Sequence, residues 1–512
     1  MPKTILAYDL GTGGNKASLY DPSANCLGSV FVPYETTYPR GGYHEQRPED
    51  WWRAVVRSTH KLLADPRVDP RSVECLAISG HSLGCVPLDA GGSLLRESTP
   101  IWSDRRADSQ AAGLFERVDE RRWYGLTGNG FPAGHYTIFK ILWLREHEPD
   151  LFARIDKVIG TKDYVNYRLT GRLATDYSYA SGSGAYDLAG WDYCDELLAA
   201  ADLPREILPP IVASTEILGE LTPAAAEELH LPKDVRVACG GVDNSCMALG
   251  AGNIDEASVY TSLGSSAWIA VSSARPLLDE RARPYVFTHV VPGMFTSAVA
   301  IFSAGTSFRW VRDQFCGDLV AAAADADDDP YERMTALAAE SPIGAGGLLF
   351  NPSLAGGSSL DGSPHIRGAL LGLDLGHSRS DVIRSAMEGI ALNLRCVLDE
   401  LRSLCDVREE ILAVGGISRS AVWRQILADA MNTRIVKTAV GQEAGSLGAA
   451  GVAAVAAGLW DDFTPIRLAH TRRQVHDPTP AAVAVYEKLL PVFDQGRDDQ
   501  ARLGEMLAEI DL

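Results

Sequence analysis

The sequence predicts an α/β protein built from two related domains. Short β-branched runs alternate with stretches of helical periodicity, which is typical of α/β folds. The chain has 512 residues, more than one ordinary domain of about 100–200 residues needs. A strand–turn–strand pattern also occurs twice, as AYDLGTGGNKASLYD near the start and as VYTSLGSSAWIAVSS near the middle. This repetition suggests two domains that open with the same hairpin, with a boundary near residues 250–257.

Each expected element follows from a local pattern. Strands are expected in the short apolar runs Ile5–Leu10, Cys75–Ser79, Val235–Cys239, Ser258–Leu263 and Ile411–Val414. Helices are expected in the periodic segments Trp51–Ala64, Ile138–Glu146, Ser380–Leu401 and Ala421–Met431. Pro48, Glu49 and Asp50 support the first helix start, because proline suits the first turn and acidic side chains complement the helix dipole there. The acidic stretch 320–328 is expected to be a solvated loop.

Composition and charge exclude several classes of partner. Hydrophobic residues make up 46% and charged residues 22% of the chain, as in an ordinary globular protein. The formal net charge of −20 argues against nucleic-acid and anionic-membrane partners, which call for a basic face. No apolar run is long enough to span a bilayer, and the N-terminus lacks a signal-peptide pattern. A cytoplasmic protein with a small-molecule substrate is the expectation.

Cysteine and histidine usage points away from disulfides and zinc. The nine cysteines show no CxxC spacing and sit in apolar stretches, so we expect buried free thiols in a reducing cytosol. The eleven histidines show no HExxH or similar spacing, which disfavours a zinc site.

The segment DLGTGGNK at Asp9–Lys16 is the first candidate for chemistry. Glycines let backbone N–H groups approach a phosphate closely, and successive N–H groups in a turn form an anion nest. The spacing of a P-loop is absent, and a strand rather than a helix follows, so it is not a dinucleotide fingerprint. A strand, a Gly/Thr turn and a strand are typical of the phosphate grip of actin-like ATPases. An ordinary β-hairpin is an equally good reading.

Three later segments can likewise be read either as part of a site or as ordinary structure. Asp243, after the two glycines of CGGVDN, could accept a proton at a strand end or simply cap a helix. Gly264-Ser265-Ser266 could grip a phosphate or be only a turn. GGISRS at Gly415–Ser420 could carry a nucleobase on its backbone or be a plain strand–helix turn with a serine cap. The order of the four segments in one chain is more informative than any one of them.

With these motifs in this order, the sequence resembles the FGGY family of carbohydrate kinases, close to the xylulokinase branch. The resemblance runs from about Ile5 to about Trp460. It rests on these further segments: HEQRPEDWW at His44–Trp52, IWSDRRA at Ile101–Ala107, KILWLREHEPDLF at Lys140–Phe152, DKVIGTKDYVNYRLTG at Asp156–Gly171, GGVDNSCMALGAG at Gly240–Gly252, SLGSSAW at Ser262–Trp268, MEGIALNLR at Met387–Arg395 and GGISRSAVWRQILADAMN at Gly415–Asn432.

The resemblance implies two actin-like (ribonuclease-H-like) domains with a central cleft. Residues 1–254 would form the N-terminal domain on the sugar side, and residues 255–512 the C-terminal domain on the ATP side. It also implies transfer of the γ-phosphoryl group of ATP to a hydroxyl of a small ketose or polyol, with ATP and Mg²⁺ as cofactors. Family members are often dimers, so a homodimer is open.

Motif positions in the family imply a role for individual residues. Asp243 would be the general base and would share the metal site with Asp9, which would hold Mg²⁺ through water. The residues implied to bind ATP are Thr12, Gly13, Lys16, Gly264, Ser265, Gly415, Gly416 and Ser420. The residues implied to face the sugar are His81, Ser82, Leu83, Asp104, Arg106 and Asn244.

One departure from the family pattern bears on the substrate. Xylulokinases usually carry Gln-Met-His-Gly where this chain has Gly80-His81-Ser82-Leu83-Gly84, so the sugar-contacting histidine of the family becomes Leu83. This change leaves D-xylulose itself open, along with erythritol, ribulose, fuculose and the autoinducer-2 signal. His81 could compensate or be a buried structural histidine. The Trp51–Trp52 pair is expected to pack a helix.

Two readings of other classes also remain. A nucleotide-binding regulator could use the actin-like clamp as a switch, although it would not need the Asp243-Asn244 pair. An actin- or chaperone-type ATPase would have no use for the segments His44–Trp52 and Ile101–Ala107.

Overall fold

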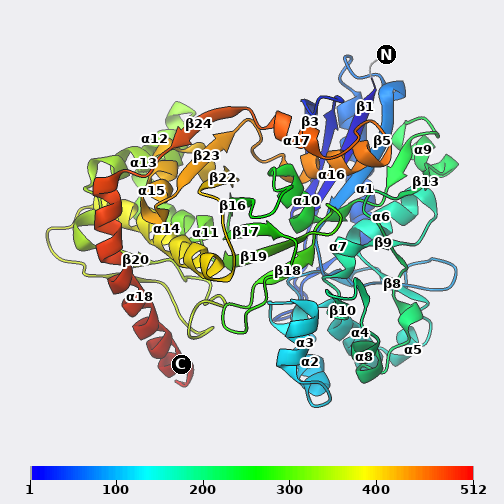
Figure 1. Cartoon of the computed structure of the whole chain (residues 1–512), viewed down its shortest axis with the longest axis horizontal. Coiled ribbons are helices and arrows are strands. Elements are labelled where there is room, and N and C mark those ends of the chain that lie inside the picture. The colour runs from blue at the N-terminus through cyan, green and yellow to red at the C-terminus, as the bar shows by residue number, and fades with distance from the viewer. Residues whose placement is uncertain (1–2, 511–512) are drawn as a thin grey trace. The chain divides into compact units, whose positions relative to one another are not determined.

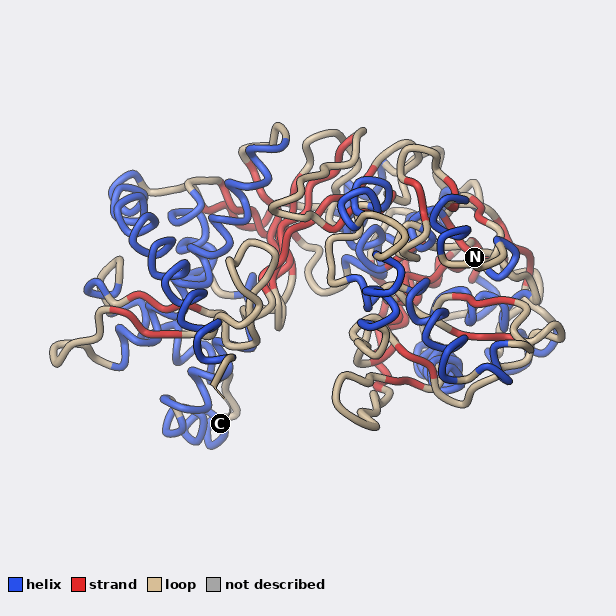
Figure 2. Tube along the Cα trace, turned by 90° about the horizontal axis from the view of Figure 1, so that it is seen from below, coloured by secondary structure: helices blue, strands red, loops and turns tan. Residues whose placement is uncertain are grey.

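The computed structural model describes residues 3–510 and divides into two compact units (Figure 1). The first unit comprises residues 1–256, 272–297 and 443–470, and the second comprises 257–271, 298–442 and 471–512. In both units the helices (blue) lie around the strands (red) in Figure 2. The α/β class is therefore confirmed. The division at residues 254 and 255 into a sugar side and an ATP side stays a prediction.

The first unit is built on a mixed sheet with strand order β13-β14-β5-β1-β2-β3. These strands are β13 (Ile217–Glu220), β14 (Arg236–Ala238), β5 (Val73–Gly80), β1 (Thr4–Gly11), β2 (Gly14–Tyr20) and β3 (Cys26–Pro33), and β15 (Gly241–Val242) also pairs with β5. β1 and β5 are parallel, whereas β1 and β2 form the predicted antiparallel hairpin. Helix α1 (Pro48–Leu63) packs on β2 and β3 and buries Trp51 and Trp52 in the core of this unit. The prediction that these tryptophans pack a helix is confirmed.

The second unit contains β16, β22, β23 and β24 and most of β17 and β19, in the order β19-β17-β16-β22-β23-β24. They are β19 (Phe295–Ile301), β17 (Ala267–Ser273), β16 (Val259–Leu263), β22 (Glu410–Val414), β23 (Arg434–Thr438) and β24 (Arg472–His476). The main helices of this unit are α11 (Gly305–Phe315), α12 (Gly317–Ala326), α13 (Pro330–Glu340), α14 (Arg379–Leu404), α15 (Ala421–Met431) and α18 (Pro480–Ala508). The long helix α14 buries an apolar face that includes Ile383, Leu394 and Leu401.

The remaining helices of the first unit surround its sheet. They include α2 (Asp108–Phe115), α3 (Glu120–Thr127), α4 (Thr137–His147), α6 (Thr161–Thr170), α7 (Tyr177–Ala180), α8 (Asp195–Ala200), α9 (Pro223–Leu229), α10 (Asp243–Gly250) and α16 (Ala444–Ala456). Helix α16 lies beside α10 and β1 although about 200 residues or more separate it from them in the chain (Figure 1). Its run of small residues permits this close packing: a Cβ added to Gly448 would lie 1.8 Å from the Cys246 carbonyl oxygen.

The predicted strands and helices are all present, with ends shifted by a few residues. The expected loop at 320–328 is wrong, because α12 runs through Ala326. Alanine has the highest helix propensity, and here it outweighs the nearby aspartates. The thiol prediction is confirmed for six cysteines, which are buried and free, but Cys26 is exposed and Cys396 and Cys405 are half-buried.

Candidate active site

The first unit brings Asp9 and Asp243 to one edge of its sheet. β1 and β15 are both parallel to β5, with Asp9 opposite Ser79 and Val242 opposite Gly80. Asp243 follows β15 directly and is the first residue of α10. Both carboxylates therefore lie at the carboxyl end of neighbouring strands, where α/β proteins place their sites.

The environment of this pair makes Asp243 a weaker acid than usual. Loss of surrounding water, together with the negative charge of Asp9, raises the pKa of Asp243 to about 7. The backbone and side-chain N–H groups of Asn244 donate to its Oδ1 over 2.8 and 3.0 Å and partly oppose this rise. Burial also raises the pKa of Asp9, against the hydrogen bond from Ser79 Oγ at 2.7 Å. The site thus holds a carboxyl group poised near neutral pH.

A buried polar network supports the segment that leads to Asp243. Lys162 Nζ lies 2.6 Å from Asp163 and 3.0 Å from Asp176, and all three side chains are fully buried. Asp176 accepts a hydrogen bond from Ser178 Oγ, which in turn accepts from the Val242 N–H at 2.9 Å. Because each member has its partners, the network fixes the backbone just before Asp243.

Gly240 lets this segment turn toward the site. Its φ of 75° is in the left-handed region, and a Cβ there would lie 2.1 Å from the Ile78 carbonyl oxygen. Only glycine meets both conditions without displacing β5.

The N-terminus of helix α16 lies next to Asp9, although the two are far apart in the sequence. A Cβ on Gly445, in the first turn of α16, would lie 2.7 Å from Asp9 Oδ2. The positive end of a helix dipole stabilises a nearby carboxylate. Sequence reasoning missed Gly445, since a glycine in an alanine-rich helix carries no signal of what it approaches.

The turn between β1 and β2 is held by side chains from three segments. Trp102 Nε1 donates to Thr12 Oγ1 at 2.8 Å, Gln46 Nε2 donates to the Thr12 carbonyl at 2.7 Å, and the Tyr34 hydroxyl donates to the Gly11 carbonyl. Gly13 at the tip is exposed, with open space around it. Lys16 lies opposite Asp9 in the register of the hairpin. Its positive charge favours the ionised form of Asp9 and so opposes the rise in the Asp9 pKa. The turn is rigid at its base and open at its tip.

The segment His81–Leu83 continues from β5 and is buried. His81 Nδ1 lies 3.2 Å from Thr161 Oγ1, and burial lowers the His81 pKa to about 4. Leu83 has a φ of 58°, unusual for a residue with a branched side chain. The Leu83 carbonyl accepts a hydrogen bond from Lys140 Nζ at 2.9 Å, and the same ammonium donates to the Ile101 carbonyl at 2.7 Å. Lys140, which sequence reasoning did not single out, joins the two segments expected to face the sugar.

Asp104 and Arg106 form a buried cluster with Glu45. The Arg106 guanidinium lies 2.8 Å from Asp104 and 2.6 Å from Glu45, and it stacks over the rings of Tyr43 and Trp143. Asp104 also accepts from the His44 N–H at 2.7 Å. Much of the polar capacity of these side chains is thus met within the cluster.

The second unit brings its two glycine turns to one edge of its sheet. β16 and β22 are parallel, with Ser262 opposite Val414, so the turn at Gly264–Ser265 and the turn at Gly415–Gly416 follow adjacent strand ends. The Gly305 N–H donates to the Gly264 carbonyl, and the Thr306 N–H donates to the Ser265 carbonyl, each at 3.0 Å. The first turn is therefore anchored by the start of α11.

The Gly415–Ser420 turn has its own internal bonds. Ser418 Oγ donates to the Gly415 carbonyl at 2.6 Å, and the Arg419 N–H donates to the Gly416 carbonyl at 3.2 Å. Ser420 is the N-cap of α15, where its hydroxyl accepts from the Trp423 N–H at 3.4 Å. The cap reading of Ser420 is confirmed, and its role toward ATP stays a prediction.

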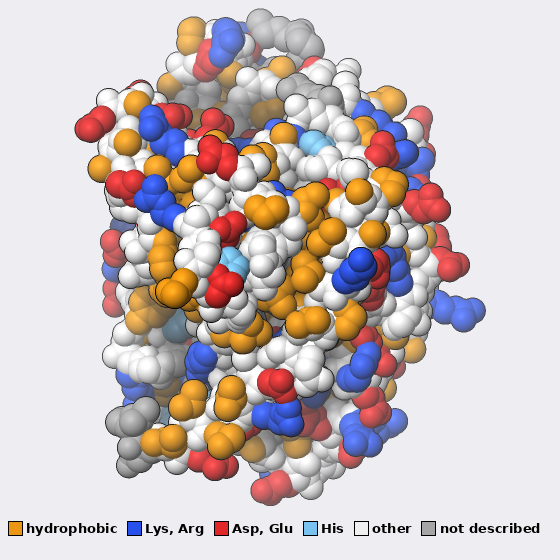
Figure 3. Space-filling view, turned by 90° about the vertical axis from the view of Figure 1, so that its left-hand side faces the viewer, with side chains coloured by type: hydrophobic (Ala, Val, Ile, Leu, Met, Phe, Trp, Pro, Cys, Tyr) orange, Lys and Arg blue, Asp and Glu red, His pale blue; other side chains and the backbone are white. Residues whose placement is uncertain are grey.

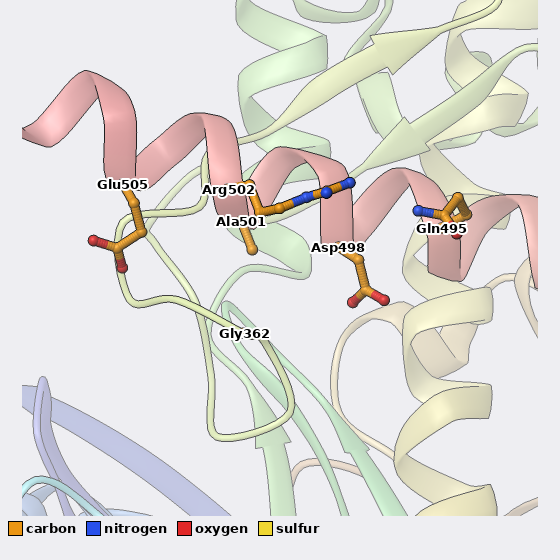
Figure 4. A pocket seen from close by; sticks show the side chains of 6 residues that line it. All are labelled: Gly362, Gln495, Asp498, Ala501, Arg502 and Glu505. Atoms are coloured by element: carbon orange, nitrogen blue, oxygen red, sulfur yellow. The ribbon is translucent and has the colours of Figure 1, made fainter.

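No cluster of three or more histidine, cysteine or acidic side chains suited to a metal occurs within residues 3–510. The Asp9 and Asp243 carboxylates remain as the predicted oxygen donors. Two cavities lie away from all predicted residues. One, of about 450 Å³, is lined by Gly362 and by α18, whose Asp498 and Glu505 point toward the loop carrying Gly362 (Figure 4). The other, of about 410 Å³, lies among α2, α4 and residues at the end of α8.

Comparison with known proteins gives matches along most of the chain. The model for the N-terminal domain of the FGGY family of carbohydrate kinases matches residues 4–250, and the model for the C-terminal domain matches residues 259–457. The chain is 30% identical over 509 residues to the xylulose kinase of Lactococcus lactis subsp. lactis (strain IL1403), covering 99% of this chain and 98% of that protein.

Two solved structures from Lactobacillus acidophilus have a similar fold. Gluconate kinase superimposes with a TM-score of 0.88 at 27% identity, covering 98% of this chain and 99% of that one. Ligand-bound xylulose kinase superimposes with the same TM-score and identity, covering 98% of both chains. Enzymes named for two different acceptors are thus equally similar in structure.

Proposed function

Since the chain belongs to the FGGY family of carbohydrate kinases and is thus an ATP-dependent sugar kinase, we propose that it phosphorylates a hydroxyl of a small ketose or polyol with Asp243 as general base. The observation that carries this proposal is the position and pKa of Asp243. It stands at a strand end beside a second carboxylate, with a pKa of about 7. A general base works best with a pKa near the working pH.

In the proposed reaction, Asp243 orients the attacking hydroxyl and accepts its proton as the bond to the γ-phosphorus forms. The bond from that phosphorus to the bridging oxygen breaks, and ADP leaves with the electron pair. Asn244, bonded to Asp243 through its side chain, would help to hold the acceptor. Because phosphoryl transfer depends mainly on positioning and charge stabilisation, the rigid base of the site matters as much as the proton transfer.

Asp9 and Asp243, at the carboxyl ends of β1 and β15, have the chemistry that suits Mg²⁺. Asp9 and Asp243 are oxygen donors, which hard divalent cations prefer, and their close negative charges raise the pKa of Asp243. We assign Asp9, acting through water, and Asp243 as the residues that would hold the ion. When bound, the ion would neutralise charge on the phosphates. Burial raises the pKa of Asp9, while Ser79 and Lys16 oppose this rise by favouring its ionised form.

Each unit carries one turn proposed to contact a phosphate of ATP. Thr12, Gly13 and Lys16 belong to the first turn, and Gly264 and Ser265 to the second. The open surroundings of Gly13 suit a close approach of phosphate to backbone. Gly415, Gly416 and Ser420 would line the adenosine, and a Cβ on Gly416 would meet no atom within 4 Å.

The geometry of these segments does not identify the acceptor. His81, Ser82, Leu83, Asp104 and Arg106 are the proposed acceptor-side residues. Their segments are tied together by Lys140, but the buried His81 and Leu83 side chains favour a role in shaping the pocket. Xylulose, ribulose, erythritol, fuculose and autoinducer-2 therefore all stay as candidates. A regulator without catalysis is disfavoured, because it would not need a base poised near neutral pH.

The test is ADP formation across a panel of pentuloses, hexuloses, polyols and gluconate, with Mg²⁺ and with EDTA. We expect one acceptor to give turnover well above the ATPase background, and EDTA to abolish it. Turnover that persists in EDTA would remove the metal assignment. Failure of every acceptor, with ATP still bound, would point either to an acceptor outside the panel or to the regulator reading.

A further inference from the structure

Arg424 lies beneath the Gly415–Ser420 turn in the second unit. It belongs to the first turns of α15 and is 1% exposed. One guanidinium nitrogen, Nη1, donates to the Ser418 carbonyl and to the Arg419 carbonyl, the latter at 2.8 Å. The side chain therefore holds the turn by its backbone, from the side of the protein interior.

The acceptors of Arg424 set it apart from other buried arginines. Arg106 and Arg384 each pair with a carboxylate. Arg424 instead donates to two carbonyls, to the amide oxygen of Gln474 and to the imidazole of His476. A buried cation without a nearby carboxylate is costly, and burial lowers the pKa of Arg424. Such a cost is tolerated where the geometry that it enforces is needed.

His476 accepts a hydrogen bond at one ring nitrogen and donates one from the other. Arg424 Nε donates to His476 Nε2 at 3.1 Å, so this ring nitrogen must carry a lone pair. The other nitrogen, Nδ1, lies 3.2 Å from Gln425 Oε1 and supplies the proton there. The Gln425 amide then donates to Asp429 Oδ1 at 2.9 Å. The network is satisfied only while His476 is neutral.

We propose that Arg424 is a positioning residue for the nucleotide turn Gly415–Ser420 and that neutral His476 holds it in place. This inference rests on the proposed function, because it takes that turn to be the adenosine side of the ATP site. It goes beyond that function by assigning the turn's support to residues of α15 and β24.

The protonation of His476 gives the inference a pH signature. A doubly protonated imidazole would turn an N–H toward Arg424 Nε and break the hydrogen bond. The charged groups near His476 are Arg424 and Asp429 on α15, Arg434 on β23 and Asp477 next to it in the chain, the last two paired at 2.6 Å. Burial and the Arg424 charge lower the His476 pKa, against Asp429. The support is therefore intact at neutral pH and is lost only as pH falls through the lowered pKa of His476.

The first test measures Mg·ADP affinity of the full chain by titration calorimetry at pH 7.5. Arg424→Met should weaken binding about tenfold or more, as loss of a charge-assisted pair of hydrogen bonds implies. Arg424→Lys should retain part of the affinity, because an ammonium can reach one carbonyl only. The matched control is Arg502→Met, whose side chain on α18 is 74% exposed and which should bind like the wild type.

The second test separates positioning from folding. His476→Gln keeps an acceptor for Arg424 but cannot titrate, so its melting temperature and its affinity at pH 7.5 should match the wild type. Between pH 7.5 and 5.5 the wild type should lose several-fold more affinity than His476→Gln, whereas the titration of the nucleotide phosphate, near pH 6, affects both equally. Equal pH profiles, or unchanged affinity in a folded Arg424→Met, would overturn the inference while leaving the ATP site intact. A wild type that binds no nucleotide would remove the proposed site, and the inference with it.

Discussion

At the scale of single residues, the acidity of Asp243 is set first by burial, which raises its pKa, and then by two neighbours. Asp9 raises its pKa by charge, and Asn244 lowers it by donating hydrogen bonds. The balance leaves the pKa at about 7, so a small change in either neighbour moves the base across the physiological range.

This balance predicts a pH profile. A base acts only when it is deprotonated, so kcat/KM should fall as pH drops below about 7. Asp9→Asn removes the nearby negative charge, which lowers the pKa of Asp243 and moves the acid limb to lower pH, besides slowing the reaction. The measurement is the pH dependence of kcat/KM for both proteins. An acid limb that stays in place would mean that another group titrates.

Lys140 is the second residue with a definite expectation. Its ammonium is buried and joins the Leu83 and Ile101 carbonyls, while burial lowers its pKa to about 8. Lys140→Met leaves both carbonyls without this donor, which should cost about 1–3 kcal/mol of stability.

The same variant should raise KM for the acceptor more than KM for ATP, since only the acceptor-side segments lose their tie. Steady-state kinetics and thermal melting check both parts. An equal rise in the two constants would argue for general damage instead.

At the scale of elements, sequence patterns predicted where the strands and helices lie, but not which elements far apart in the sequence contact each other. The Asp9–Lys16 hairpin and the strand expected at Val235–Cys239 follow from local alternation and turn residues, and both are present, the latter as β14. The short strand β15, which directly precedes Asp243, was not predicted. The approach of α16 to Asp9 involves residues 9 and 445, and no local pattern encodes such a pair. The alanine-rich α12 was mistaken for a loop because charge was given more weight than propensity.

The α16 contact predicts a specific effect of Gly445→Ala. The added Cβ would lie 2.7 Å from Asp9 Oδ2, so the carboxylate or the helix must move. A displacement of about 1 Å in a phosphoryl-transfer site can cost up to ~100-fold in rate, and we expect kcat to fall at least tenfold with little loss of stability.

Gly317→Ala is the matched control, because it lies in a helical first turn with no atom within 4 Å of the added Cβ. Its kcat should equal that of the wild type. A Gly445→Ala enzyme with unchanged kcat would show that the Asp9 position tolerates the shift.

At the scale of the whole molecule, charge and exposed apolar side chains indicate which kinds of partner the protein could bind. The absence of a nucleic-acid partner, expected from the net charge of −20, stays a prediction. Within residues 3–510 no helix is both long and apolar enough to cross a membrane. Figure 3 shows apolar side chains (orange) gathered among charged ones on one face. Large apolar side chains on α18 are exposed, namely Val492, Leu503, Met506 and Leu507. A homodimer stays a prediction.

The most direct test of Asp243 as general base is the turnover of Asp243→Asn with the acceptor found in the panel. Loss of a general base should lower kcat by about 10²–10⁴-fold, while the affinity for ADP measured in EDTA changes little. Asp21→Asn, at an exposed turn, should behave like the wild type. An Asp243→Asn enzyme that retains near-normal kcat would contradict the assignment of Asp243 as the base.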